Sequence, residues 1–335
     1  NRMEQFVNNF PMEEAHLTGE EIHNRLDEIE EIHALYSPTI LGLAAALACC
    51  AFTFLLGGGL VEMVLAFIAA GIGNLVRTKL IKHHYTLFLN IAMSISAACL
   101  AYALCLKLAE VLFHLPAFHE AGYICSILFI IPGFPFITSG IDLAKLDLRS
   151  GLERLTYAII IILVATMFAW IMALLLDLQP LTFTSMSLNP ILLLCLRIIA
   201  SFCGVFGFSI MFNSTIPMAA IAALIGAVAN TFRLELIDFT GMPPAAAAFI
   251  GALSAGLLAS EIKKNNGYPR ISLTVPSIVI MVPGLYLYRA IYNFGIMSLT
   301  EAVSWFTSAI MIIIMLPLGL IFARILTDRT FRFCT

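Results

Sequence analysis

The sequence predicts an all-α integral membrane protein, and three observations lead to this fold class. Of its 335 residues, 61% are hydrophobic and only 12% are charged, which gives a mean hydropathy of +0.97. Soluble domains carry about 25% charged residues, so this chain has too few charges to cover a surface in water. Its apolar residues lie in long runs without the short alternating pattern of β-barrel strands. The runs also recur in the same order in the two halves of the chain.

The first 37 residues are polar and acidic, and they predict a cytoplasmic amphipathic segment. Thr18 and Glu21 form the T-x-x-E pattern of a capping box, in which each side chain binds the backbone N–H of the other residue. Apolar residues then recur at helical spacing as far as Tyr36. We therefore expect an amphipathic helix at about 18–35, whose acidic residues form a solvated face. A partner-binding or gating surface is the alternative.

Ten stretches are long and apolar enough to cross a bilayer, which takes about 17–25 residues. The first two are separated only by Gly57-Gly58-Gly59, which indicates a tight hairpin. The predicted spans are 39–56, 60–76, 86–107, 121–140, 156–176, 190–212, 216–233, 243–260, 271–290 and 301–324.

Lys and Arg residues are unevenly distributed between the predicted loops. The side that holds the N-terminus carries 14 of them, and the other side carries 4. Cytoplasmic loops hold the excess of positive charge, so both termini should be cytoplasmic and the number of spans should be even. We expect a multi-pass protein of the cell membrane, most readily a bacterial inner membrane.

The chain contains an internal duplication. At an offset of 156 residues, AFIAAGIGNLVR (66–77) aligns with AALIGAVANTFR (222–233). Further on the offset is 151, where SILFIIPGFPFITSGID (126–142) aligns with SIVIMVPGLYLYRAIYN (277–293). Each half has five spans, and an odd number inverts the second half, as in many secondary transporters. The predicted divisions are the cytoplasmic segment 1–37, a first five-helix membrane repeat 38–180, and a second repeat with a cytoplasmic tail 181–335.

Two predicted spans contain a Pro-Gly pair at matching positions, Pro132-Gly133 and Pro283-Gly284. Pro135 adds a second break to the first of these spans. Pro removes a backbone hydrogen bond and kinks a helix, and the freed groups are tolerated in a membrane only where protein or a water-filled cavity satisfies them. Broken helices in corresponding positions of two halves indicate a transporter site. We assign these residues a gating role, with two kinked packing helices as the alternative.

Polar residues follow each break, and ionisable residues beside an apolar span are costly and often functional. Asp142 and Asp147 are the candidates for proton coupling, with Lys145 one turn from Asp142 on the same expected helix face. The candidates for substrate binding are Thr138, Ser139, Arg289 and Asn293, where Arg289 would pair with a carboxylate. A salt-bridged cytoplasmic loop and an interfacial anchor are the simpler alternatives.

The remaining polar residues indicate packing or surface roles. Asn74 and Asn230 each end a run of small residues, where an amide can bond across a helix contact. His83, His84, His114 and His119 are expected at the surface. The eight cysteines form no CxxC pair, and no Walker A, GxSxG or HExxH motif is present. We expect no metal, no cofactor and no enzymatic activity, and the net charge of −3 gives no case for a nucleic-acid partner.

The segment PGFPFITSGIDLAKLDLRSGLERL (132–155) resembles the signature of the threonine/serine exporter family. In that family a P-G-x-P segment precedes an Asp, then a second Asp and a Ser-Gly-x-x-R tail. Residues 17–38 look like the end of the family's soluble N-terminal region, and residues 195–324 resemble its second membrane domain. Family members often carry Arg just before the first Asp, whereas Gly140-Ile141 stand there in this chain.

The resemblance implies a secondary exporter of small hydroxy amino acids coupled to the proton gradient. We therefore predict a proton-coupled exporter of threonine or serine that works by alternating access. A dicarboxylate exporter of the succinate type, as in related split systems, and a passive channel for small polar solutes are the alternatives. The expected partners are a small-molecule substrate, protons and the lipid bilayer, and the oligomeric state is left open.

Overall fold

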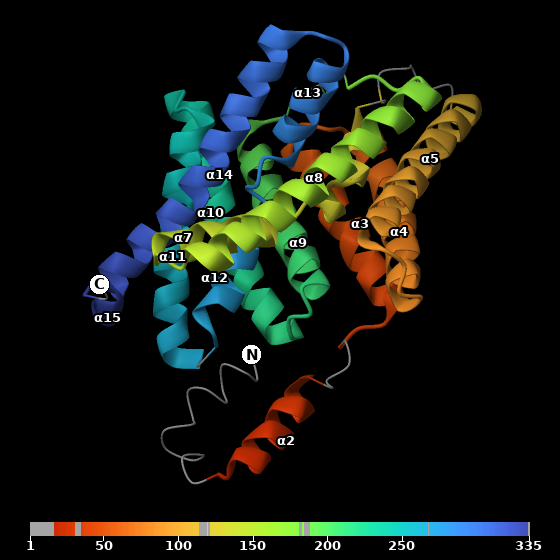
Figure 1. Ribbon diagram of the computed structural model, residues 1–335. Coiled ribbons are helices and arrows are strands. Elements are labelled where there is room, and N and C mark those ends of the chain that lie inside the picture. The colour runs from red at the N-terminus through yellow and green to blue at the C-terminus, as the bar shows by residue number, and fades with distance from the viewer. Residues whose placement is uncertain are drawn as a thin grey trace.

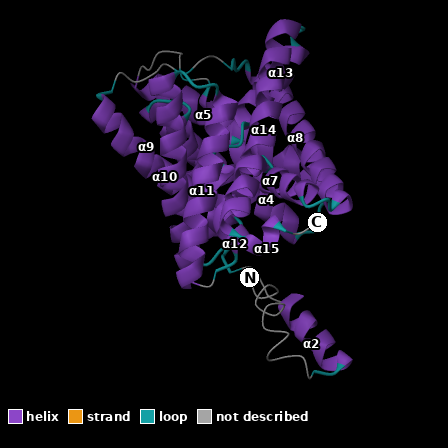
Figure 2. Cartoon of the chain, turned by 90° about the vertical axis from the view of Figure 1, so that its left-hand side faces the viewer, coloured by secondary structure: helices purple, strands orange, loops and turns teal. Residues whose placement is uncertain are grey.

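The computed structural model describes residues 17–30, 35–113, 119, 121–180, 183, 188–266 and 268–333. In this part of the chain every regular element is a helix (Figure 2). Eight of these helices are long and apolar enough to cross a membrane. They are α3 (Pro38–Leu55), α4 (Leu60–Lys82), α5 (Leu87–Phe113), α8 (Leu148–Leu176), α9 (Pro190–Met211), α10 (Ile216–Thr240), α11 (Pro244–Asn266) and α14 (Leu299–Thr327).

Two further apolar segments are bent in the middle. The first joins α6 (Gly122–Ser126) and η2 (Leu128–Ile130) to α7 (Gly133–Ala144) through a bend of 55°. The second joins α12 (Arg270–Val279) to α13 (Gly284–Gly295) through a bend of 49°. The count of spans is therefore eight, or ten if each bent pair is one span.

The N-terminal segment forms α2 (Gly19–Glu30), which lies apart from the helix bundle in Figure 1. The predicted capping box is confirmed, since the Thr18 N–H donates to Glu21 Oε2 at 2.8 Å and the Glu21 N–H to Thr18 Oγ1 at 3.4 Å. The described part of this helix reaches Glu30, and residues 31–34, over which it was predicted to continue, lie outside the described part.

Many of the buried residues in the bundle are small, and many large apolar side chains lie at its surface. Ala48, Ala66, Ala222 and Ala255 are fully buried, whereas large residues such as Leu104 (59% exposed) lie at the surface. A soluble protein shows the opposite pattern. Small residues let membrane helices approach closely, and lipid tails solvate the large ones, so this distribution supports the membrane assignment.

Backbone turns recur at the offset of 151 residues. Pro132 (φ −80°, ψ 59°) and Pro283 (φ −83°, ψ 55°) have nearly the same conformation at the two breaks. After α7 and α13, Leu146 (φ 63°) and Met297 (φ 62°) both take the left-handed conformation that few non-glycine residues adopt. Each is followed by a helix of 29 residues, α8 or α14. The sequence duplication is thus matched by local backbone geometry.

Candidate functional site

The two breaks lie against each other. In each, the glycine N–H donates to the carbonyl two residues earlier, Gly133 to Ile131 at 2.8 Å and Gly284 to Val282 at 2.9 Å, which forms a three-residue turn around the proline. A Cβ added to Gly133 would lie 3.2 Å from Val282 Cγ2, and one on Gly284 would overlap Ile131 Cδ1. Glycine therefore permits the close approach of the first break to the second.

A buried hydrogen bond also joins the two broken segments. The hydroxyls of Tyr123 on α6 and Tyr288 on α13 lie 2.5 Å apart, and their ring centroids lie 5.7 Å apart. Both side chains are almost fully buried, at 0% and 1% exposure. Because a buried hydroxyl is costly without a partner, this pair fixes how α6 and α13 meet in this conformation.

A cavity of about 260 Å³ reaches the first break. Pro132, Gly133 and Pro135 line one wall, and Asn74 and Arg77 of α4 line another. A second cavity of about 420 Å³ shares Arg77, and it continues to His84 and Tyr85 past the end of α4. The two together connect the first break to the end of the bundle where α4 terminates.

Arg77 is the polar centre of this region. Its Nη1 donates to the carbonyl of Phe129, directly before the break, at 3.3 Å. A guanidinium presents five donors in a planar fork that suits carboxylates. The cavity at the break is smaller than the roughly 300–1,000 Å³ of sites for drug-sized ligands. This arrangement can therefore bind a small molecule that carries a carboxylate.

An arginine and an asparagine also lie beside the second break, at the positions that align with Arg77 and Asn74. Arg233, 156 residues after Arg77, donates from Nε to Asn230 Oδ1 at 3.1 Å, and Asn230 Nδ2 donates to Ser201 Oγ at 2.8 Å. A Cβ on Gly251 would lie 3.1 Å from Arg233 Cβ and 3.2 Å from Met281 Sδ, which places Arg233 next to the second break. The packing role predicted for Asn230 is confirmed, since its amide bonds across α10 to α9.

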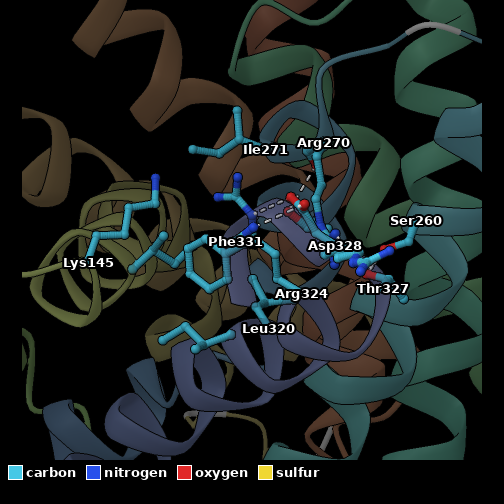
Figure 3. A pocket seen from close by; sticks show the side chains of 13 residues that line it. Lys145, Ser260, Arg270, Ile271, Leu320, Arg324, Thr327, Asp328 and Phe331 are labelled. Carbon is cyan, nitrogen blue, oxygen red and sulfur yellow. Dashed lines mark hydrogen bonds and ion pairs between the residues drawn. The ribbon is translucent and has the colours of Figure 1, made fainter. Parts of the chain in front are cut away.

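A third cavity, of about 690 Å³, lies at the C-terminal end of α14 (Figure 3). Among the described residues, its lining includes the cations Lys145, Arg270, Arg324 and Arg329, the last from the short helix α15 (Arg329–Arg332), and one carboxylate, Asp328. In Figure 3, Lys145 approaches from one side of the hollow and Arg270 from the other. Four cations against one carboxylate make this cavity favourable for anions.

Asp142 forms an ion pair with the next helix and not with Lys145, which was expected to share its helix face. Asp142 Oδ2 lies 2.6 Å from Nη1 of Arg154 on α8. Lys145 is the residue after α7, where the helix ends, and its side chain lines the cationic cavity instead. Asp142 is 16% exposed, so it is a largely shielded carboxylate that is held by a cation of the next helix.

Asp147 is the N-cap of α8, where its Oδ1 accepts a hydrogen bond from the Ser150 N–H at 3.3 Å. The hydrogen bonds from Ser150 lower the pKa of this exposed carboxyl. The stabilisation by the cap is therefore present at neutral pH and is lost only as pH falls through the depressed pKa. Helix capping accounts for the position of Asp147.

The four predicted substrate residues lie beyond the breaks, on α7 and α13. The hydroxyls of Thr138 and Ser139 are buried and donate to carbonyls of their own helix, at 3.0 Å and 2.8 Å. The Arg289 guanidinium lies 4.8 Å from the Trp305 ring centroid, and Asn293 donates to the Arg289 carbonyl at 2.8 Å. None of the four lines the cavities described above.

Sequence reasoning missed two ionisable residues inside the bundle. Arg77 was predicted to lie in a cytoplasmic loop, but α4 continues to Lys82 and holds it at the cavity; its alignment with Arg233 was the available signal. The surface position predicted for His119 is also wrong, because this residue is only 17% exposed and contacts the buried Glu62. His83 and His84 are exposed as predicted, and His114 lies outside the described residues.

Comparison with family models covers both halves of the chain. The ThrE model ("Putative threonine/serine exporter") matches residues 1–176, which is more than half of the chain. The chain belongs to the threonine/serine exporter family. A second model of the family, ThrE_2 ("Threonine/Serine exporter, ThrE"), matches residues 197–326. Both models are described as exporters, so the chain falls in a family of membrane transporters.

Two curated relatives are similar to part of this chain. Both are named "Probable succinate transporter subunit YjjP". The protein of Escherichia coli (strain K12) is 28% identical over 156 residues, which cover 46% of this chain and 57% of the relative. That of Klebsiella aerogenes is 27% identical over 160 residues, which cover 47% and 58%. The chain thus spans somewhat more than half of these relatives' length. No solved structure matches it.

Proposed function

We propose that this member of the family is a proton-coupled secondary exporter of threonine or serine that works by alternating access. The observation that carries the proposal is the contact between two helices broken at equivalent positions, with a cavity that leads from one end of the bundle to the first break. Broken helices at the midplane are typical of secondary transporters. Arg77 would bind the substrate carboxylate there.

We further propose that residues 38–180 and 181–335 form two five-helix repeats of opposite orientation, with both termini in the cytoplasm and the protein in the cell membrane. The equal conformations of Pro132 and Pro283 support a structural duplication. Five spans per half would invert the second copy. Each half could then open its own break to one side of the membrane.

Opposite orientation predicts opposite accessibility for equivalent loops. Single cysteines at His83 and Thr240, both exposed after α4 and α10, would be introduced into a variant without the eight native cysteines. A membrane-impermeant maleimide should label the cysteine at 240 in intact cells, and the cysteine at 83 only after permeabilisation. Equal labelling of both positions in intact cells would contradict the inverted arrangement.

The residues proposed from the sequence keep their roles in this scheme. Asp142 is the proton-coupling candidate near the cytoplasmic end, because its carboxylate is shielded at the end of α7; Asp147 would only support it. Thr138, Ser139, Arg289 and Asn293 would contact substrate in a conformation where α7 and α13 have moved apart. Pro132, Gly133, Pro135, Pro283 and Gly284 would act as the points at which these helices bend.

The test is transport by the purified full chain in proteoliposomes, with labelled threonine and a pH gradient of either sign. We expect threonine to accumulate against its own gradient, and a protonophore to abolish the accumulation. Asp142→Asn should lose accumulation but keep threonine exchange at equal pH. Movement of threonine only down its own gradient, whatever the pH gradient, would contradict coupling and support a passive channel.

The cationic cavity favours a dicarboxylate as the second candidate substrate. Its lining carries four cations and one carboxylate, an excess of positive charge that suits a doubly charged anion better than a zwitterionic amino acid. The relatives named as succinate transporter subunits point the same way. Labelled succinate in the same proteoliposomes separates the two substrates: accumulation of succinate without threonine would replace the first proposal by the second.

A further inference from the structure

One buried carboxylate of the bundle takes no part in the cavities described above. Glu62 lies in the first turn of α4 and is only 1% exposed. It precedes Arg77 by 15 residues, about 22 Å along the same helix, so it lies at the opposite end of the bundle from the cavity that Arg77 lines.

Glu62 has one titratable partner among the described residues. Its Oε1 lies 2.8 Å from Nδ1 of His119, while its Oε2 is buried without a hydrogen-bond partner in the described part of the chain. The ion pairs in that part do not join Glu62 to Lys or Arg. Within the described part of the chain, His119 is the residue in contact with this carboxylate that can balance its charge.

The packing around Glu62 leaves little room. A Cβ on Gly122 of α6 would overlap the Tyr102 hydroxyl of α5 and lie 3.0 Å from Glu62 Cβ. Tyr102 donates to the His119 carbonyl at 2.6 Å and so helps to position the histidine. Cys125 of α6 is a further titratable group that interacts electrostatically with Glu62, and it also interacts with Arg289 of α13.

A buried carboxylate without a compensating charge costs several kcal/mol. If the pair holds one proton, either both groups are neutral or Glu62 is negative and His119 positive, and both forms are balanced. If that proton is lost, a single negative charge stays in the bundle. Charge balance therefore favours the closed conformation of this end when the pair holds a proton.

We propose that Glu62 and His119 form the proton-binding site of the transport cycle at the end of the bundle opposite Arg77. When this end is open, a proton from solvent would bind one ring nitrogen of His119, and the proton on the other nitrogen would pass to Glu62 Oε1. Closure of this end, with the Arg77 cavity open, would then take place only with the proton bound, which couples the change of state to the proton gradient. The inference rests on the proposed proton coupling, and it assigns the step at which the proton enters.

The test compares Glu62→Gln with the wild type in proteoliposomes with labelled threonine and labelled succinate. Gln has nearly the shape of the protonated Glu but cannot release a proton. We expect Glu62→Gln to lose accumulation driven by the pH gradient and to keep exchange at equal pH, with the pH dependence of exchange flattened. Accumulation by Glu62→Gln with the wild-type pH profile would overturn the inference and leave the proposed function standing.

A second variant and a sodium gradient separate proton binding from a structural role and from sodium binding. If Glu62→Gln lost exchange as well, Glu62→Asp decides: recovery of gradient-driven accumulation supports a titrating carboxylate, and failure to recover overturns it. A sodium gradient at equal pH should drive nothing; accumulation under that condition would make the pair a sodium site and overturn the proposal. If transport by the wild type does not depend on the pH gradient, the proposed function itself is refuted. This outcome differs from a failure of the inference, in which only Glu62→Gln behaves like the wild type.

Discussion

Arg77→Gln should nearly abolish export while the protein still inserts and folds. The guanidinium lines the cavity at the first break and donates to the Phe129 carbonyl there. A hydrogen bond to a charged group contributes about 1.5–3 kcal/mol, which corresponds to about 10- to 150-fold in apparent affinity for a carboxylate substrate. The measurement is the initial rate of threonine export against substrate concentration, where KM should rise by this factor.

Two comparison variants make the result specific. Arg149→Gln is the matched control, because Arg149 is 91% exposed and its ion pair is with Glu153, four residues away; it should transport like the wild type. Arg77→Lys keeps the charge but loses the planar fork. Its KM should therefore lie between those of Arg77→Gln and the wild type. If Arg77 only held the Phe129 carbonyl, Arg77→Gln would lower the melting temperature and leave KM unchanged.

Much of the fold followed from the sequence because membrane helices are set by local composition. Long apolar runs predicted the spans, and the T-x-x-E pattern predicted the cap at Thr18 that the structure shows. The Pro-Gly pairs predicted both bends, because proline lacks the backbone N–H and so removes a helical hydrogen bond. These features depend on residues close together in the chain, so one sequence is enough to find them.

The site was less predictable because it depends on which residues meet across the bundle. Asp142 and Lys145 were expected to share a helix face, but the ion pair of Asp142 is with Arg154 of the next helix. Arg77 follows an apolar run and resembles a loop cation, and only the longer α4 brings it to the break. Glu62 and His119 are 57 residues apart, and no local pattern in the sequence connects them.

Substitution of both Gly133 and Gly284 by Leu should block transport. A Cβ on Gly284 would already overlap Ile131 Cδ1, and one on Gly133 would approach Val282 Cγ2 to 3.2 Å. Extra side-chain volume in a packed contact costs about 1–3 kcal/mol. If the two breaks must move past each other in each cycle, this cost raises the free-energy barrier between the two conformations. Turnover should then drop by about tenfold or more.

The comparison that isolates this effect is Gly19→Leu, since a Cβ at Gly19 of α2 would meet nothing within 4 Å. That variant should transport at the wild-type rate. The single variants should be ordered, with Gly284→Leu more damaging than Gly133→Leu, because the contact at Gly284 is closer. Insertion is checked by size-exclusion chromatography of the purified protein, and turnover by exchange of labelled threonine at saturation. Wild-type turnover in a well-folded double variant would show that the breaks serve packing alone, because a contact filled by two leucines could not then be one that opens during transport.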